Sequence, residues 1–422
     1  MWPRAFPHWN FRLIALLFLL MASFALRIAY CHATTGLGGS LGRHYREYLI
    51  QGRRFIELGT LVSPFILERV PTEPSALLPP GYTLVVAAVF GIFGVETTAS
   101  FFVLQLVNAL ATTLVVWFVF LTAERLGGRY AAWVAALIAA LHPALIGFTT
   151  YFWDTSLLAL GVSMTIYLAV TLRDSKESVS SWCLYGLFLG LVAMVNPSLT
   201  AAYPFLVLWP ITKRFGFRPR PMLSYVPVVI AGWVVALAPW TIRNYLHFGE
   251  WFYVRNGFAH ELWIGVCPEA DTDPPEAFFG RFPLLNAQAQ RRISEIGETA
   301  YIQECAASAK AAIRADPLRY LRLTAVRAVD YWAGTVFSRA RAESPGVPRN
   351  WPHRAICVLL VLESCVLLVC LFRRIGGSGE LRWPALTALT FSIVYCLTHV
   401  QVRFRTPIEP ILILWTLAVF DP

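Results

Sequence analysis

The sequence predicts an all-α, polytopic membrane protein with about ten transmembrane helices. Of its 422 residues, 57% are hydrophobic and only 14% are charged, which is too apolar for a soluble protein. Several apolar runs approach the roughly 20 residues that a helix needs to cross the hydrocarbon core. These runs are continuously apolar rather than alternating, which favours helices over the strands of a closed barrel.

The first apolar run, residues 11–30, is longer than the core of a signal peptide, and no small-x-small cleavage site follows it. We interpret it as an uncleaved anchor. Asn196-Pro197 is a turn signal between two short runs, which favours a tight hairpin there. The nine further predicted spans are approximately residues 99–121, 131–148, 155–172, 182–195, 199–211, 225–240, 355–372, 383–398 and 411–420.

The basic loops between these runs predict the orientation of the chain, because loops rich in Arg and Lys stay in the cytoplasm. All five basic segments share one side only if residues 79–93 do not cross the membrane. We therefore expect that run to lie in the outer interface, and both termini to be cytoplasmic. The basic residues of four segments are Arg4 and Arg12, Arg125 and Arg129, Arg173 and Lys176, and Arg373, Arg374 and Arg382; the fifth segment is "KRFGFRPR".

This topology predicts three regions. Residues 1–240 form an N-terminal transmembrane module with outer loops at 31–98 and 150–155. Residues 241–354 are polar and form an outward-facing helical segment. Residues 355–422 contain the C-terminal transmembrane helices. A disulfide between Cys267 and Cys305 is possible in the outward segment, and the other cysteines lie mostly in apolar runs.

Carboxylates in the outward loops are candidate catalytic groups. Asp154 in "YFWDTS" follows three aromatic residues at the outer end of a span, where a carboxylate is costly and indicates function. Its alternative role is to cap the helix that starts at Thr155. In the first outer loop, "GRHYREYLIQGRRF" predicts an amphipathic helix with His44 and Glu47 among its polar groups, most of which are expected to face solvent.

Arginines at the same side of the membrane are candidate phosphate ligands. Arg403 and Arg405 in "HVQVRFRTPIEP" contradict the positive-inside trend, so orientation does not explain them. Guanidinium groups suit phosphate oxygens, and Arg243 in "PWTIRNY" is similarly placed. The alternative is that these arginines pair with carboxylates or lipid headgroups, or anchor a helix in the interface. Glu363 lies mid-span and is interpreted as a hydrogen-bonded core carboxyl.

The sequence requires no cofactor. It contains no GxGxxG, Walker-type loop or HExxH motif, and no cluster of ligands demands a metal, although Asp154 and Glu47 could contribute to one. The formal charge of +10 lies largely in short loops beside apolar runs, which indicates orientation by membrane lipid rather than a nucleic-acid partner.

Five blocks in order resemble bacterial integral-membrane glycosyltransferases of the GT-C class, of the protein-mannosyltransferase-like kind. The resemblance covers most of the chain and implies a GT-C-like bundle with outward-facing loop helices. The blocks are "LLPPGYTLVVAAVFGIFGVETTAS", "YFWDTS", "NPSLTAAYPFLVLW", "PWTIRNYLHFGEWFYVRNGFAHELWIG" and "VRFRTPIEP".

The resemblance implies a sugar donor linked to a polyprenyl phosphate and used on the outer face of the bacterial cytoplasmic membrane. It implies that Asp154 is the second-loop acidic residue, that Arg403 and Arg405 hold the donor phosphate, and that Arg243 supports them. One departure is clear. The family's early first-loop carboxylate is missing from "GSLGRH", so Glu47 or His44 substitutes for it, Asp154 works alone, or catalysis is lost.

The predicted function is therefore transfer of a sugar from a polyprenyl-phosphate donor to a glycan, lipid or protein acceptor, with inversion at the anomeric carbon. Two alternatives remain open at this stage. A transporter or flippase of a lipid-linked sugar would share the arginines, but no inverted repeat is visible and few ionisable groups lie mid-membrane. An inactive relative that acts as a subunit would explain the missing carboxylate.

Overall fold

A computed structural model of the chain describes residues 8–39, 46–67, 69–71, 73–174, 178–270, 280–333, 358, 361–365 and 382–416. Its secondary structure over these residues is helical, apart from one isolated β-bridge between Val62 and Pro74. The all-α prediction is therefore confirmed.

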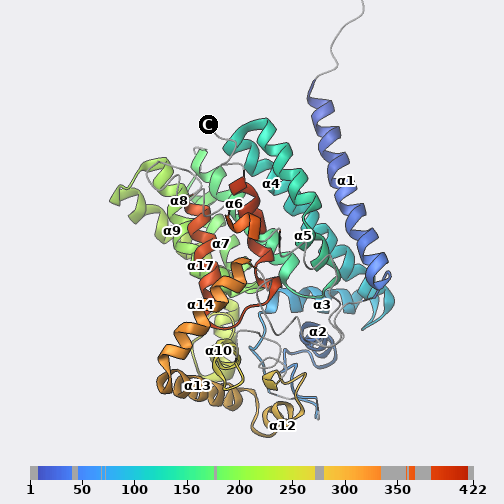
Figure 1. Cartoon of the computed structure of the whole chain (residues 1–422), viewed down its shortest axis with the longest axis vertical. Helices are drawn as coiled ribbons and strands as arrows, with labels where there is room; N and C mark the ends of the chain where they lie inside the picture. Colours follow the sequence, from blue (N-terminus) through green and yellow to red (C-terminus); the bar gives the residue numbers. More distant parts are fainter. Residues whose placement is uncertain are drawn as a thin grey trace, which may run out of the picture.

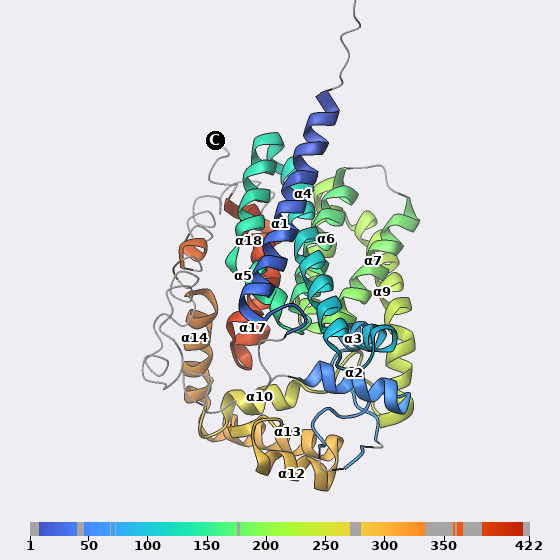
Figure 2. The same ribbon diagram turned by 90° about the vertical axis from the view of Figure 1, so that its right-hand side faces the viewer.

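The long helices run side by side as a bundle along the long axis of the molecule (Figures 1 and 2). Four described helices are long and apolar enough to cross a membrane, which confirms the membrane character of the chain. These four are α1 (His8–Thr35), α4 (Thr98–Leu141), α6 (Thr155–Asp174) and α9 (Pro219–Phe248). Shorter bundle helices are α5 (Pro143–Gly147), α7 (Val179–Val195), α8 (Tyr203–Phe215), α17 (Arg382–Leu397) and α18 (Glu409–Thr416).

A second group of helices, which we call the cap, covers one end of the bundle (Figure 2). Helix α3 lies across the ends of the long helices, the orientation expected of a segment that does not cross the membrane. Helix α14 (Pro317–Ala333) connects the cap back toward α17. The cap consists of α2 (Glu47–Leu58), α3 (Pro80–Phe93), α10 (Phe258–Val266), α12 (Ala287–Ile296) and α13 (Glu298–Ala315).

Helices α4 and α9 differ most from the predicted runs. Helix α4 contains both runs 99–121 and 131–148 in part, and its 44 residues would be roughly 66 Å long, about twice the hydrocarbon thickness. Gly128 divides it, because its φ of 79° is a conformation that glycine adopts readily and other residues rarely do. Helix α9 continues past residue 240 to Phe248, because the first stop signal is the left-handed Gly249. The predicted domain boundary at residue 241 therefore lies inside α9.

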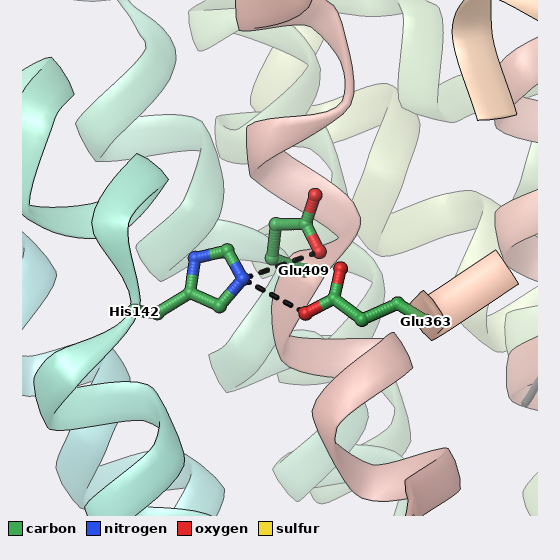
Figure 3. Close-up of side chains that lie close together, drawn as sticks. All are labelled: His142, Glu363 and Glu409. Atoms are coloured by element: carbon green, nitrogen blue, oxygen red, sulfur yellow. Dashed lines mark hydrogen bonds and ion pairs between the residues drawn. The ribbon is translucent and has the colours of Figure 1, made fainter. Parts of the chain in front are cut away.

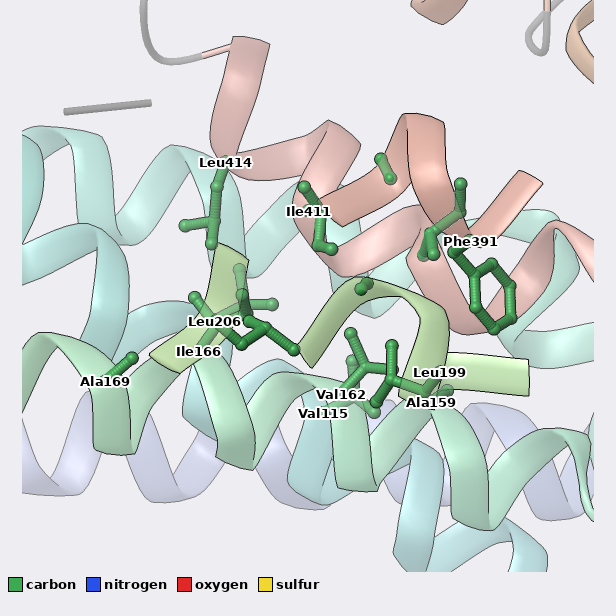
Figure 4. Close-up of a cluster of buried hydrophobic side chains, with 14 of the residues drawn as sticks. Val115, Ala159, Val162, Ile166, Ala169, Leu199, Leu206, Phe391, Ile411 and Leu414 are labelled. Atoms are coloured by element: carbon green, nitrogen blue, oxygen red, sulfur yellow. The ribbon is translucent and has the colours of Figure 1, made fainter. Parts of the chain in front are cut away.

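Interdigitated apolar side chains hold the bundle together (Figure 4). Val115 of α4, Ile166 of α6, Phe391 of α17 and Ile411 of α18 are fully or almost fully buried in one cluster. Helices α7 and α9 approach most closely through Gly186, where an added Cβ would lie 1.9 Å from the carbonyl oxygen of Val229. Small residues at such crossings are typical of helices that pack in a membrane.

The disulfide between Cys267 and Cys305 does not form. Both are free, buried thiols in separate apolar clusters, Cys267 beside Leu323 and Cys305 beside Ile302. Each packs among apolar side chains as a small hydrophobic residue.

Candidate active site

A cavity of about 510 Å³ lies where the cap meets the bundle. The loop before α3 and the cap contribute apolar wall residues, among them Phe65, Leu77 and Phe282. Polar side chains reach the cavity from the start of α2, from α10, and from the loops that precede α6, η2 (Pro197–Ala202), α10 and α18. These polar residues are Glu47, Asp154, Asn196, Arg255, His260, Glu261, His399 and Arg403.

Asp154 lies at the bundle side of this cavity, immediately before α6, and is 8% exposed. Its Oδ2 accepts a hydrogen bond of 2.8 Å from Asn196 Nδ2, and the Tyr48 hydroxyl also donates to the carboxylate. Asn196 is fixed in turn, since its own Oδ1 accepts from the backbone N–H of Ser198. Burial raises the pKa of the Asp154 carboxyl, and the positive charge of Arg403 opposes that shift. The arrangement suits a base that takes up a proton inside the cavity.

Glu47 brings a second carboxylate to the same space. It is the first residue of α2, is 6% exposed, and its Oε2 accepts no hydrogen bond from the described residues. Burial raises the pKa of the Glu47 carboxyl, and Arg403 again opposes the shift. His44, the other candidate from this loop, lies outside the described residues.

Arg403 supplies a positive charge beside Asp154. It belongs to the short 3₁₀ helix η4 (Val402–Phe404), and its guanidinium carbon lies 3.8 Å from the centre of the Trp153 ring. Its Nε donates to Gln401 Oε1 at 2.9 Å. Among the described residues Arg403 forms no ion pair with a carboxylate, so its charge is available to an anion in the cavity.

Arg405 does not reach the cavity, although the sequence places it with Arg403 as a phosphate ligand. It is 1% exposed and points into the bundle, where it contacts Glu363 Oε2 at 2.8 Å and Glu409 Oε1 at 3.0 Å. Arg403 and Arg405 point to different sides of this tight turn, which their two-residue spacing in the sequence did not reveal. Arg405 is therefore paired with carboxylates, as the alternative interpretation of the sequence expected.

Arg243 also lies away from the cavity. It is inside the last turns of α9, and its Nη atoms donate to the backbone carbonyls of Ser75 and Leu61 at 2.9 and 3.3 Å. The Ser75 hydroxyl donates to the Glu298 carboxylate at 2.8 Å. Arg243 and Glu298 thus hold the loop between α2 and α3, whose Phe65 and neighbours form a wall of the cavity. Its contribution to the site is indirect.

Arg255 and Glu261 are cavity residues that the sequence analysis did not single out. Arg255 Nη2 lies 2.8 Å from Glu261 Oε1, and His399 Nδ1 lies 3.5 Å from Glu261 Oε2. Burial raises the pKa of the Glu261 carboxyl, but Arg255 and the nearby His399 and His260 together outweigh it and lower the pKa to about 2. Burial lowers the pKa of His399 to about 4, so its imidazole is neutral at pH 7. Both Arg255 and Glu261 lie in the block "FYVRNGFAHELW". They are six residues apart among aromatic residues, so the sequence did not indicate that they form a pair.

A second polar cluster lies inside the bundle (Figure 3). His142 Nε2 lies 2.9 Å from Glu363 Oε1 and 3.7 Å from Glu409 Oε2. Among the described residues, this is the one place where three His, Cys, Asp or Glu side chains bring possible metal-ligand atoms within 4.8 Å of one another. The other ring nitrogen of His142 has no hydrogen-bond partner there, whereas a metal-binding histidine ordinarily donates its second N–H. Arg405 contacts both carboxylates, so we interpret the cluster as an ion-pair network.

Comparison with known families agrees with the first three of the five blocks found in the sequence and does not extend to the C-terminal block, residues 402–410. Residues 78–242 match the family model described as dolichyl-phosphate-mannose-protein mannosyltransferase. The match includes Asp154 and the loop that carries it. It confirms, over this part of the chain, the resemblance to GT-C membrane glycosyltransferases. No curated protein sequence matches the chain.

Similar solved structures include ArnT from Cupriavidus metallidurans. The crystal structure of that protein bound to undecaprenyl phosphate is 15% identical in sequence, with a TM-score of 0.45, and the similarity covers 96% of this chain and 77% of that chain. Its apo structure is 17% identical, with a TM-score of 0.41, and covers 94% of this chain and 78% of that chain.

Proposed function

We propose that this GT-C-like membrane protein transfers a sugar from a polyprenyl-phosphate-linked donor to an acceptor hydroxyl in the cavity between bundle and cap. One observation supports this most directly: Asp154 and Arg403 face the same cavity, beside each other, and Arg403 has no carboxylate partner in the described residues. A base for the acceptor and a cation for the leaving phosphate are the two groups this reaction needs.

In the proposed reaction, the acceptor oxygen attacks the anomeric carbon while the Asp154 carboxylate takes the hydroxyl proton. A new bond forms between the acceptor oxygen and the anomeric carbon. The bond from that carbon to the phosphate oxygen breaks, and the lipid phosphate leaves with the electron pair. Arg403 stabilises the added charge. A single displacement inverts the anomeric carbon.

Glu47 is our candidate to replace the carboxylate missing from residues 39–44. Its carboxylate reaches the cavity from the N-terminus of α2, and it lies close enough to Arg403 for that charge to affect its pKa. Its unbonded oxygen is available to orient the acceptor or a sugar hydroxyl. This placement favours an active transferase over the inactive relative.

The cavity is proposed to face outward. Asp154 precedes the first residue of α6, and the basic Arg173 lies in the last turn of the same helix. A helix of 20 residues is roughly 30 Å long, so cavity and basic turn lie on opposite sides of the hydrocarbon core. Basic turns stay in the cytoplasm, which leaves the cavity outside.

The test is transfer from a radiolabelled pool of polyprenyl-phosphate sugars, with the purified chain in lipid and extracts of its own host as acceptor. We expect label to move to a glycan, lipid or protein, and Asp154→Asn to abolish the transfer. Asp174→Asn, at the other end of α6, is the matched control and should remain active. Donor binding without transfer would instead support the inactive relative or a transporter.

A further inference from the structure

Two arginines separated by one residue lie in opposite environments. Arg403 faces the cavity, whereas Arg405 is buried among carboxylates of the bundle. We propose that Arg405 is a positioning residue, which holds the turn that presents Arg403 to the donor phosphate. This proposal rests on the function proposed above.

Arg405 contacts three separate helical segments, namely α14, residues 361–365 and α18. Its Nη2 contacts Glu363 in helical residues 361–365 at 2.8 Å, and its Nη1 donates to Ser364 Oγ at 3.1 Å. Nη1 also donates to the backbone carbonyl of Trp332 in α14 at 2.6 Å. Nε lies 3.0 Å from Glu409 at the start of α18. A planar guanidinium can make these contacts simultaneously, and an ammonium cannot.

Further contacts, made by neighbouring residues, hold the backbone on both sides of Arg405. The preceding turn η4 is held through Phe404, whose carbonyl accepts from the Tyr331 hydroxyl at 3.2 Å and whose ring stacks on Tyr395 at 4.3 Å. The following turn η5 (Thr406–Ile408) closes when the Ile408 N–H donates to the Arg405 carbonyl at 2.9 Å. The chain from residue 402 to 408 therefore has its anchors in the bundle.

Arg403 itself has few anchors. Its side chain is held by the hydrogen bond to Gln401 and by the Trp153 ring. Its position in the cavity thus depends on the backbone of the turn, which Phe404 holds on one side and Arg405 on the other. A displacement of about 1 Å is enough to weaken a phosphate contact strongly. Arg405 would then affect donor binding without touching the donor.

A double-mutant cycle tests this assignment. Binding of a polyprenyl monophosphate, without sugar, is measured in lipid nanodiscs for the unmodified chain, Arg405→Lys, Arg403→Ala and the double variant. We expect Arg405→Lys to weaken binding about tenfold when Arg403 is present and less than about twofold in Arg403→Ala, because Arg405 acts through Arg403. A general loss of structure would weaken binding equally in both backgrounds and would overturn the assignment.

A milder variant and a control complete the cycle. Ser364→Ala removes one hydrogen bond to Arg405 and should show the same coupling at about two- to threefold, should Arg405→Lys fail to fold. Arg27→Lys changes an equally buried arginine that contacts Thr112 in the bundle, and it should show no coupling to Arg403. If the unmodified chain does not bind the lipid phosphate, the proposed function fails and the assignment with it. Binding with equal losses overturns the assignment alone.

Discussion

The two charged clusters of this protein use the same residue types for different ends. In the bundle, Arg405 contacts both Glu363 and Glu409, and His142 closes the network. In the cavity, Asp154 and Arg403 face a space that can admit a ligand. A charge buried in a membrane protein is costly unless it is paired or functional. The bundle cluster is paired, and we propose that the cavity cluster is functional.

The charged residues of one short motif can therefore belong to different clusters. "RFR" contributes one arginine to each cluster, with Phe404 between them packed on Tyr395. Which arginine meets substrate depends on the turn of the backbone rather than on the residue type.

Removing the Asp154 charge should affect chemistry rather than folding. Asp154→Asn keeps the shape but cannot take a proton, and we expect transfer to fall by about a thousandfold. Initial rates at saturating donor, together with the thermal unfolding temperature, check this. An unchanged rate would remove Asp154 from the reaction.

Neutralising Glu363 should lower stability rather than the rate of the chemical step. Glu363→Gln breaks a buried ion pair with Arg405 and weakens the contact to His142, at a cost of about 3 kcal/mol in stability. Thermal unfolding in detergent measures this loss. The protein that remains folded should retain most of its turnover at saturating donor, while its donor binding weakens because Arg405 loses a contact. Equal stability of the variant and the unmodified chain would mean that the bundle cluster is not a structural network.

Glu47 and Glu57 offer a matched pair on α2. Glu47 faces the cavity, and Glu57 has a side chain that is 52% exposed. We expect Glu47→Gln to lower kcat/KM about 10- to 100-fold and Glu57→Gln to have no effect. Similar activity in both variants would leave the missing first-loop carboxylate without a replacement.

The smallest effect should be a change in pH dependence. Asn196 donates to the Asp154 carboxylate and favours its ionised form, which lowers the pKa of Asp154. Asn196→Ala removes this bond, so the pKa rises and the basic form exists only at higher pH. The acid limb of the kcat/KM profile should move up by less than about one pH unit. Asn286→Ala, which removes the cap of α12, is the control and should leave the limb in place.

Much of the fold could be predicted from the sequence, because continuous apolar runs and basic turns report membrane helices directly. The loop position of Asp154 and the role of residues 79–93 follow from that pattern. The partition of Arg403 and Arg405 could not be predicted, since it depends on carboxylates at positions 363 and 409 brought together only by packing. The pair of Arg255 and Glu261 was missed for a similar reason: their contact forms across a turn within an aromatic stretch.

A cryo-electron microscopy structure of the chain with a polyprenyl monophosphate bound would show where the lipid phosphate lies. We predict density for the phosphate in the cavity, within hydrogen-bond distance of Arg403 and beside Asp154, while Arg405 remains bonded to Glu363 and Glu409. Phosphate density at Arg405, or at a site outside the cavity, would contradict the account.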